Sequence, residues 1–341
     1  MIGRRSQVVL VAIGFAVAFA VAFTTVSSDA LARPSERGVV DIYAVIGYPR
    51  GVTGGTGVVM TPDGEVLTNN HVIRGAVSVR VVDPASGRSY AATVVGYDLS
   101  TDLAVLQLRR ASNLPTVAFG NSGTARLGEA VTAIGNAGGV GGAPRVTGGR
   151  IVGLDRSLRV ADGHNGFQQL HVLIETSAPL QPGDSGGPLL DSAGTVIGLD
   201  TAAAFPRGGR GARGDGFSIP IDPARAIAQR IESGRRSASV HIGPTPFIGV
   251  DVEQSGPRDA GTESTRGALV EGVVASSPAQ RAGLAHGDLI TMLDGRRISS
   301  FSAIAGVVVA LAPGARIGVG WLAPSGVVHR GWMRLASGPP Q

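Results

Sequence analysis

Two consecutive series of short apolar runs constrain the fold more strongly than any other feature of the sequence. The first series occupies residues 38–112 and the second residues 130–221. Each run is as long as a β-strand, is rich in β-branched residues, and is bounded by Gly, Pro, Asp or Asn. Two sets of about six strands are typical of paired barrels and not of alternating βαβ units. The sequence therefore predicts a mainly β protein with two six-stranded antiparallel β-barrels.

The composition agrees with a turn-rich β protein and excludes several kinds of site. The chain has 52 glycines among 341 residues and no cysteine, which rules out disulfides, thiol catalysis and Cys-based metal sites. Its formal net charge of +5 comes from arginine alone, since it has no lysine. The loop at residues 205–216, FPRGGRGARGDG, has no interleaved aromatic residues, so we interpret it as a surface loop and expect no nucleic-acid partner. H-x-x-x-H and H-E-x-x-H patterns are absent, and we expect no metal and no cofactor.

The N-terminus has the features of an export signal. Two arginines precede the apolar run Val8–Phe23, and Ala30-Leu31-Ala32 follows as an A-x-A cleavage site. The run is slightly shorter than the roughly 20 residues that span a bilayer comfortably, so an uncleaved membrane anchor is the alternative. In both cases the residues after position 32 lie outside the cytoplasm. We therefore expect a secreted or cell-envelope protein whose only membrane contact is an uncleaved segment 1–32.

A helix and a polar segment separate the two strand series from a third module. DPARAIAQRIES, Asp222–Ser233, has an aspartate suited to the N-cap, a proline suited to the first helical position, and a glycine after its end. Residues 235–245 are charged and contain Ser and Pro, so we interpret them as a linker. The third module has strand-like runs and helical stretches at SPAQRAG and residues 302–311. The predicted boundaries are 33–234 for the first domain, 246–336 for the second, and 337–341 for a frayed tail.

The stretch QPGDSGGPLL, residues 181–190, fits the pattern G-x-S-x-G around Ser185. One hydrolase class places such a serine between a strand and a helix, with an acid and then a histidine after it. The residues that follow Ser185 instead predict a strand, a turn and a second strand. The downstream histidines, His241, His286 and His329, lie in the linker or the third module. The sequence therefore favours the other class with this pattern, the chymotrypsin-like proteases.

Upstream residues supply a better base and acid. His71 closes the strand EVLTNN, where a side chain can project into a cleft, whereas His164 and His171 occupy a polar loop and a strand start. Asp102 is a lone carboxylate at the start of the apolar strand in TDLAVL. Burying it is costly unless it accepts hydrogen bonds, for instance from an imidazole N–H. The resulting order is His71, Asp102, Ser185.

Three motifs in this order resemble the HtrA-like family of exported serine proteases: TNNHV at 68–72, TDLAVL at 101–106 and QPGDSGGP at 181–188. Residues 55–73 and FSIPI at 217–221 resemble the same family, and the third module resembles a PDZ domain. The nearest likeness is to single-PDZ, secreted, trypsin-fold proteases of actinobacteria. The resemblance implies two chymotrypsin-like barrels followed by a PDZ domain, in a serine endopeptidase that acts on unfolded or damaged envelope proteins.

The resemblance also implies a role for each motif residue. Ser185 Oγ would attack the scissile carbonyl, His71 would take its proton, and Asp102 would fix the imidazole tautomer. The backbone N–H groups of Gly183, Asp184 and Ser185 are expected to surround the developing oxyanion. In digestive-type proteases the aspartate at the position of Asp184 pairs with a new apolar N-terminus made by activation cleavage. Export cleavage of this chain would leave Arg33 at the N-terminus instead. We therefore expect the Asp184 carboxylate to pair with a local backbone group or an arginine.

The substrate pocket is predicted from positions near the serine. The position six before it, where trypsin-like enzymes carry the acid that holds Arg or Lys, is Pro179. Apolar or small side chains are expected on the pocket wall at Leu180, Thr201, Ala203 and Ala204. The sequence therefore predicts cleavage after small or medium aliphatic residues.

The PDZ-like module is expected to bind peptide C-termini. In PDZ domains a loop of backbone N–H groups grips the terminal carboxylate, and the peptide adds as an extra strand. Here that loop is expected at Phe247, Ile248, Gly249 and Val250. The peptide would lie along residues 250–252 and pack against the helix at 302–311.

Two further expectations concern function and assembly. The rival to a protease is a PDZ-dependent chaperone or binding protein whose protease domain is latent, and a serine esterase is a third alternative. A homotrimer is expected from the family, in which an aromatic N-terminal segment often builds the trimer. Tyr43 and Tyr48 are the aromatic residues available there.

Overall fold

The computed structural model describes residues 36–47, 51–161, 167–204, 215–237, 239–254 and 266–340. Among these residues, no helix combines the length and the apolar character needed to cross a membrane. The expected signal segment 1–32, with its apolar run Val8–Phe23, lies outside the described residues. So do most of the loop at 205–216, Tyr48 and His164.

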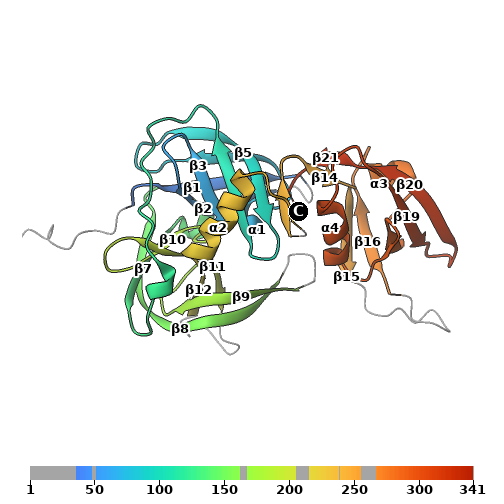
Figure 1. The fold of residues 1–341 in the computed structure, drawn as a ribbon. Coiled ribbons are helices and arrows are strands. Elements are labelled where there is room, and N and C mark those ends of the chain that lie inside the picture. Colours follow the sequence, from blue (N-terminus) through green and yellow to red (C-terminus); the bar gives the residue numbers. More distant parts are fainter. Residues whose placement is uncertain are drawn as a thin grey trace, which may run out of the picture. The chain divides into compact units, whose positions relative to one another are not determined.

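The first strand series forms a seven-stranded antiparallel sheet (Figure 1). Its strand order is β13-β5-β4-β1-β2-β3-β6, and β5 also pairs with β6. A single helical turn, α1 (Asn70–Ile73), follows β3. The strands are β1 (Val39–Ile46), β2 (Gly51–Val59), β3 (Glu65–Asn69), β4 (Ala76–Val82), β5 (Ser89–Asp98), β6 (Leu103–Leu108) and β13 (Val240–Ile242).

The second series forms a closed six-stranded barrel in the order β10-β11-β12-β9-β8-β7. Two short 3-10 turns accompany it, η2 (Ser122–Thr124) and η3 (Ala137–Gly139). The barrel strands are β7 (Ala130–Gly135), β8 (Arg145–Ala161), β9 (Phe167–Thr176), β10 (Pro188–Leu190), β11 (Val196–Ala204) and β12 (Asp215–Pro220).

The structure thus has one closed six-stranded barrel where the sequence predicted two. The first series is a seven-stranded sheet in which β5 and β6 also pair, and its seventh strand comes from the expected linker. Val240 and His241 on β13 are buried, and the strand pairs with the end of β5. Burial of this apolar segment against the sheet adds the seventh strand, so the linker assignment for residues 235–245 is wrong for β13.

The helix α2 (Ile221–Glu232) packs against both strand series. It contacts β5 and β6 of the seven-stranded sheet and β11 and β12 of the barrel. Its buried residues are Ile221, Ala224, Ala228 and Ile231, which share one helical face. The sequence predicted Asp222 as the N-cap, but the observed N-cap is Pro220, two residues earlier. The Asp222 carboxylate instead accepts a hydrogen bond from Ser122 Oγ over 2.9 Å, which ties the helix start to η2.

The third module forms a sheet in the order β15-β16-β17-β19-β20, with β18 paired to β17. A second, two-stranded sheet joins β14 to β21, so the predicted tail begins inside a strand. The helices α3 (Pro278–Ala282) and α4 (Phe301–Val309) occupy the predicted positions. The strands are β14 (Thr245–Phe247), β15 (Val250–Gln254), β16 (Ala268–Val273), β17 (Leu289–Leu293), β18 (Arg296–Arg297), β19 (Arg316–Leu322), β20 (Val328–Arg334) and β21 (Ala336–Gly338).

Candidate active site

His71 lies in α1, immediately after β3, and both its backbone and its ring contact Asp102. Its Nδ1 is 2.6 Å from Asp102 Oδ2, and its backbone N–H donates to Asp102 Oδ1 over 2.8 Å. The Asp102 carbonyl accepts a further bond from Asn70 N–H over 3.0 Å. The His71 side chain is 40% exposed, whereas that of Asp102 is 7% exposed. Asp102 therefore orients an imidazole that stays accessible.

Asp102 is a buried carboxylate in a left-handed backbone conformation. Its φ is +59°, which aspartate and asparagine tolerate better than most residues. Thr201 Oγ1 donates to Asp102 Oδ2 over 2.8 Å. Burial acts to raise the pKa of Asp102, but the charge of His71 and hydrogen bonds from His71 and Thr201 outweigh burial and hold that pKa below its usual value. Asp102 is therefore ionised at neutral pH, next to the imidazole.

Residues 181–184 form a type II β-turn immediately before Ser185. Asp184 N–H donates to the Gln181 carbonyl over 3.0 Å, and Gly183 at the third position of the turn has a φ of +100°. Pro182 occupies the second position, which this turn type favours. Any Cβ at Gly183 would overlap the Asn136 carbonyl oxygen. The letters QPGD are thus a turn sequence that sets the entry to the serine.

The orientation of the peptide between Pro182 and Gly183 is fixed from outside the turn. The Pro182 carbonyl accepts a hydrogen bond from Gly138 N–H over 2.7 Å. Because the C=O and N–H of a trans peptide point in opposite directions, Gly183 N–H points away from Gly138. Among the described residues, no protein acceptor receives a hydrogen bond from Gly183 N–H or Ser185 N–H. These two amides are free to bind an oxyanion.

Asp184 N–H is not free to bind an oxyanion, although the sequence predicted it as a third donor beside Gly183 and Ser185. It is engaged in the turn by its bond to the Gln181 carbonyl. In a type II turn the amide of the fourth residue closes the turn, so it cannot also face a substrate. This geometry leaves Gly183 and Ser185 as the candidate oxyanion donors.

Ser185 Oγ donates to the Thr201 carbonyl over 3.3 Å. Since Thr201 Oγ1 also binds Asp102, Thr201 joins the serine to the His71–Asp102 pair. Within the described part of the chain, Ser185 Oγ makes no hydrogen bond to His71 Nε2. Catalytic hydrogen bonds are often long or absent before substrate binds. Thr201, predicted as pocket wall, thus contacts two members of the predicted triad.

Thr56 on β2, which the sequence did not single out, connects the first sheet to the nucleophile loop. Its N–H donates to the Ser185 carbonyl over 2.8 Å, and its Oγ1 donates to the Gly183 carbonyl over 2.7 Å. The same hydroxyl accepts from Asn136 N–H over 2.8 Å. Thr56 is fully buried. One side chain therefore holds the nucleophile loop and the end of β7 together.

We expect Thr56→Val to lower kcat about tenfold with little change in KM, because the turn at Gly183 loses one of its supports. The unfolding free energy should fall by about 1–3 kcal/mol for each of the two backbone groups left unpaired. Steady-state kinetics and denaturant unfolding measure both effects. Thr93→Val, which removes an exposed hydroxyl bonded to the Gln107 carbonyl, is the control. A Thr56→Val protein with reduced stability and unchanged kcat would restrict Thr56 to a structural role.

The Asp184 carboxylate has the local partners that the sequence predicted. Its Oδ2 accepts from Gln181 N–H over 2.8 Å and lies 3.5 Å from Arg145 Nη1. Burial raises the pKa of Asp184, against the opposing effects of the Gln181 bond and the Arg145 charge. Arg145 Nη1 also donates to the Pro179 carbonyl over 3.0 Å. Arg145 therefore connects the predicted pocket position to the nucleophile loop.

Of the remaining predicted pocket residues, the structure describes the side chain of Leu180 but not those of Ala203 and Ala204. Leu180 is 5% exposed and packs in the apolar interior of the barrel, against Gly216 on β12. The apolar pocket therefore stays a prediction.

Asp200, one residue before Thr201 on β11, is a second buried carboxylate behind the serine. It is fully buried, and its Oδ1 accepts from Ser218 Oγ over 2.6 Å. Its backbone binds the two residues after Ser185, because Gly186 N–H donates to the Asp200 carbonyl and Asp200 N–H to the Gly187 carbonyl. Burial raises the pKa of Asp200 well above its usual value despite the Ser218 bond, and the charge of Asp184 raises it further.

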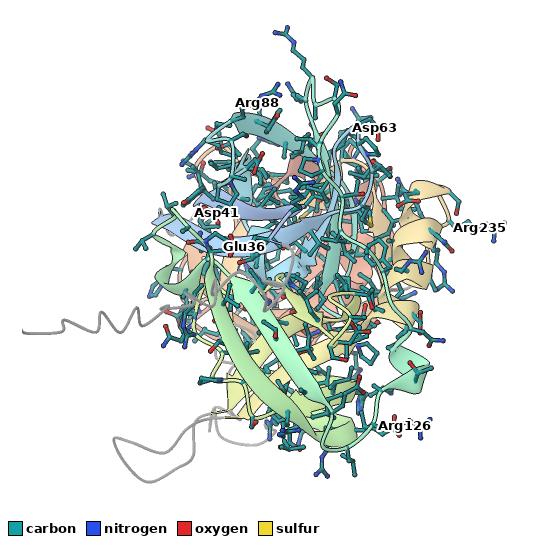
Figure 2. The ribbon with its side chains drawn as sticks, turned by 90° about the vertical axis from the view of Figure 1, so that its left-hand side faces the viewer. Glu36, Asp41, Asp63, Arg88, Arg126 and Arg235 are labelled. Carbon is teal, nitrogen blue, oxygen red and sulfur yellow. The ribbon has the colours of Figure 1, made fainter. Side chains whose placement is uncertain are left out.

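We expect Asp200→Asn to stabilise the protein progressively as pH rises above about 4. The folded state holds the Asp200 proton more tightly than the unfolded state, so ionisation on raising the pH destabilises the native protein, and asparagine cannot ionise. Thermal unfolding from pH 4 to 9 tests this, with Asp63→Asn as the control. Asp63 is an exposed carboxylate in the turn before β3 (Figure 2). Equal unfolding temperatures for wild type and Asp200→Asn across this range would contradict the expectation.

Outside the His71–Asp102 pair, the described histidines are engaged away from the serine, including those downstream of Ser185 that the first hydrolase class would require. His241 is fully buried on β13, and its Nε2 lies 3.2 Å from the Gly243 carbonyl. His286 Nδ1 lies 2.9 Å from the Glu271 carbonyl, and His329 stacks on Trp321. His171 on β9 lies next to Ser157. None of these contacts involves Ser185.

The predicted PDZ loop lies between β14 and β15. Gly249 has a φ of +84°, and a Cβ there would overlap the Ser277 side chain. The carbonyls of Ile248 and Gly249 accept bonds from Ala279 and Val274, whereas among the described residues their own N–H groups donate to no protein acceptor. β15 pairs only with β16 within the described sheet and therefore forms its edge. The two loop amides are candidate donors to a terminal carboxylate, and the edge strand β15 is the candidate site for an added peptide strand.

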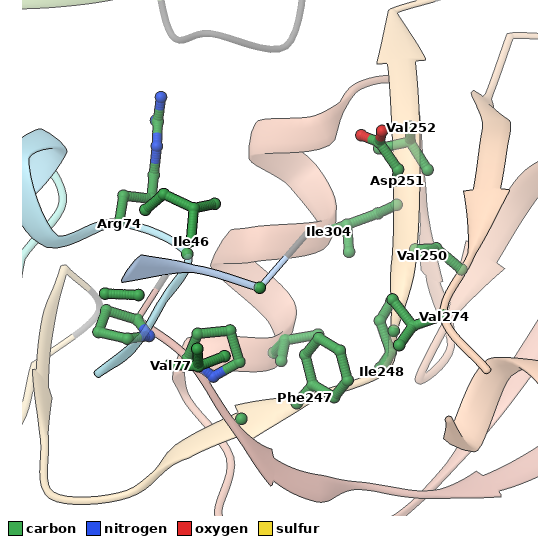
Figure 3. Close-up of a pocket in the computed structure, with 18 of the residues that line it drawn as sticks. Ile46, Arg74, Val77, Phe247, Ile248, Val250, Asp251, Val252, Val274 and Ile304 are labelled. Atoms are coloured by element: carbon green, nitrogen blue, oxygen red, sulfur yellow. The ribbon is translucent and has the colours of Figure 1, made fainter. Parts of the chain in front are cut away.

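A pocket of about 700 Å³ adjoins this loop (Figure 3). Apolar side chains of the module form one wall of it, from the loop, from β15 and from α4. These are Phe247, Ile248, Val250, Val252, Ile304 and Val308. An apolar side chain near a peptide C-terminus would fit such a wall.

Two family models match the chain. A trypsin-like peptidase domain matches residues 55–199, which include all three residues of the predicted triad. A PDZ domain matches residues 246–322.

Several relatives match most of the chain. A probable periplasmic serine endoprotease, DegP-like, of Chlamydia muridarum is 37% identical over 272 residues, covering 77% of this chain and 50% of the relative. The periplasmic serine endoprotease DegP of Escherichia coli K12 is 34% identical over 270 residues, covering 79% of this chain and 54% of the relative. This chain therefore spans about half the length of these two proteins. The solved structure of the HtrA-type protease AlgW with a tripeptide matches at 34% identity and a TM-score of 0.51, over 90% of this chain and 96% of that one.

Proposed function

The chain belongs to the HtrA family of serine proteases, with a trypsin-like domain followed by a PDZ domain, and on that premise we propose that it is an exported serine endopeptidase. The observation that carries the proposal is the combination of an oriented His71–Asp102 pair with two free amides beside Ser185. We further propose that its substrates are unfolded or damaged proteins of the cell envelope or secreted fraction. Periplasmic location in the named relatives supports this compartment.

In the proposed mechanism, His71 accepts the proton of Ser185 Oγ as the oxygen attacks the scissile carbonyl, and later gives it to the leaving amine. The ionised Asp102 holds Nδ1 protonated, so that Nε2 is the basic nitrogen, and stabilises the imidazolium. The N–H groups of Gly183 and Ser185 bind the oxyanion that forms. Thr201 contacts both Ser185 Oγ and Asp102, whereas Thr56 positions the nucleophile loop through the Gly183 and Ser185 carbonyls.

The decisive test is labelling by a fluorophosphonate, which reacts with activated serines only. Wild type should be labelled on the peptide that contains Ser185, and Ser185→Ala should not be labelled. The labelled protein should also lose its ability to degrade an unfolded protein substrate. Absence of labelling under every condition would favour the rival, a PDZ-dependent binding protein or chaperone with a latent protease domain.

We predict cleavage after small or medium aliphatic residues, because the pocket position carries Pro179 and not an acid. Leu180 and the alanines of β11 would complete an apolar wall. A peptide library read by mass spectrometry measures the preference at the cleaved position. A profile dominated by Arg or Lys would show that the pocket assignment is wrong.

We propose that the PDZ domain binds apolar peptide C-termini along β15, with the amides of Ile248 and Gly249 on the terminal carboxylate. Binding of a peptide with a free apolar C-terminus to Ser185→Ala protein tests this, with the same peptide carrying a C-terminal amide as control. Equal binding of both peptides would contradict carboxylate recognition. We also propose that the protein forms a homotrimer. We further propose that it is most like the single-PDZ secreted proteases of actinobacteria.

A further inference from the structure

The C-terminal part of the chain has an unusual charge distribution. Residues 295–341 contain five arginines and no Asp or Glu, so this segment alone carries a charge equal to the formal net charge of the whole chain, +5. All five lie on β18, β19 and β20, and four of them share a face: Arg297, Arg316, Arg330 and Arg334. The structure shows no ion pair for any of them within its described residues.

Strand register places these four arginines on one face of the sheet. Arg316 lies opposite Arg334, and Gly320 lies opposite both Arg330 and Met292. Met292 in turn lies opposite Arg297. Directly paired residues, and residues two apart on a strand, point to the same side of a sheet. The core residues of this module, among them Ile317, Val319, Trp321 and Met333, alternate with them and face the other side.

The same face carries exposed apolar side chains. Beyond residue 245, the structure describes four exposed large hydrophobic residues, and all four lie on β17 or on the β19–β20 hairpin (β19 and β20 are labelled in Figure 1). They are Met292 at 37%, Val327 at 52%, Val328 at 67% and Trp332 at 64% exposure. Trp332 lies against Gly318, and the Arg316 guanidinium is 4.8 Å from its ring centroid. We call this surface the arginine–tryptophan face: Arg297, Arg316, Val328, Arg330, Trp332 and Arg334.

We propose that the arginine–tryptophan face binds the surface of an anionic lipid bilayer. Arginine is well suited to lipid phosphate because its guanidinium presents several N–H donors in a planar fork. Tryptophan favours the headgroup level of a membrane, where its ring is buried and its N–H stays solvated. Val328, which shares the side of β20 that carries Arg330 and Trp332, adds an exposed apolar side chain to this face. An acidic peptide would use the arginines but would leave these exposed apolar side chains without a partner.

This surface is separate from the PDZ loop and from Ser185, and the proposal depends on the proposed function only for export to a compartment that contains a membrane. The test uses Ser185→Ala protein that begins at Arg33, so that neither proteolysis nor the N-terminal apolar run contributes. That protein contains the whole compact unit Pro34–Gln341. Failure of lipid binding and failure of catalysis are therefore observed independently.

The protein should sediment with vesicles of phosphatidylcholine and phosphatidylglycerol, and much less with phosphatidylcholine alone. Of the two tryptophans, Trp321 is 6% exposed and Trp332 is 64% exposed, so a blue shift on vesicle binding reports Trp332. Trp332→Phe should abolish the shift. Arg297→Gln with Arg330→Gln should weaken partitioning about 25-fold, at roughly fivefold per arginine.

The matched control is Arg88→Gln with Arg126→Gln, which changes the net charge equally at two exposed arginines of the protease domain (Figure 2). Control protein should bind anionic vesicles within a factor of about two of the Ser185→Ala parent. Equal binding to neutral and anionic vesicles, or equal weakening by both pairs, would overturn the proposal. Soluble polyglutamate serves as the acidic-peptide probe. If it shifted Trp332 emission as strongly as anionic vesicles do, the face would be an acidic-peptide site and the proposal would be overturned.

Discussion

Asp102→Asn should lower kcat about 10⁴-fold while leaving the fold intact. The Asp102 side chain now accepts at both oxygens, from His71 N–H at one and from Nδ1 and Thr201 Oγ1 at the other. An asparagine can present only one oxygen. If that oxygen stays on His71 N–H, the amide NH₂ faces Nδ1 and forces the tautomer in which Nε2 carries the proton. Nε2 then cannot accept the proton of Ser185.

The opposite orientation of the amide is no better, because it turns two donors, NH₂ and His71 N–H, toward each other. Asparagine tolerates a positive φ as aspartate does, so the backbone at 102 should not be strained. Asp155→Asn is the matched control, since Asp155 is exposed and has a φ of +53°. Single-turnover kinetics with a peptide substrate measure the effect. If kcat in Asp102→Asn remained within tenfold of the control, Asp102 would not set the tautomer of His71.

The fold class and the predicted triad were accessible from sequence because their signals are local. Strand length, β-branched content and turn residues mark each strand of the barrel within a few positions. The motifs around His71, Asp102 and Ser185 likewise pair a reactive side chain with a diagnostic neighbourhood. β13 was missed for the opposite reason. It is three residues long, and its only strand signal is pairing with β5, which is distant in the chain.

The residues that support the site could not be predicted, because their roles depend on contacts between distant strands. Thr201 reaches Asp102 across 99 positions, and Thr56 reaches the Gly183 carbonyl across 127. Each is an ordinary threonine in a strand until the sheets assemble. The same holds for Asp200, whose burial behind the serine follows from barrel closure and not from its neighbours in sequence.

Gly183→Ala should lower kcat/KM by about 10²–10³, the cost of losing one oxyanion donor. The residue has a φ of +100°, which an L-residue with a Cβ adopts only with strain. The added methyl would also overlap the Asn136 carbonyl oxygen and crowd the backbone nitrogens of Gly138 and Gly139. Relief requires the peptide between Pro182 and Gly183 to rotate. Rotation breaks the bond from Gly138 N–H and turns Gly183 N–H away from the oxyanion.

Strain at a positive φ and loss of the oxyanion donor can be separated by a second glycine. Gly194, in the turn before β11, has a φ of +77°, and a Cβ there meets no neighbouring atom. Gly194→Ala should therefore show the backbone strain alone, with a lower unfolding temperature and nearly wild-type kcat/KM. Gly183→Ala should lose activity far beyond its change in unfolding temperature. If the two variants retained equal activity, the amide of Gly183 would not stabilise the transition state, and the oxyanion would depend on Ser185 N–H alone.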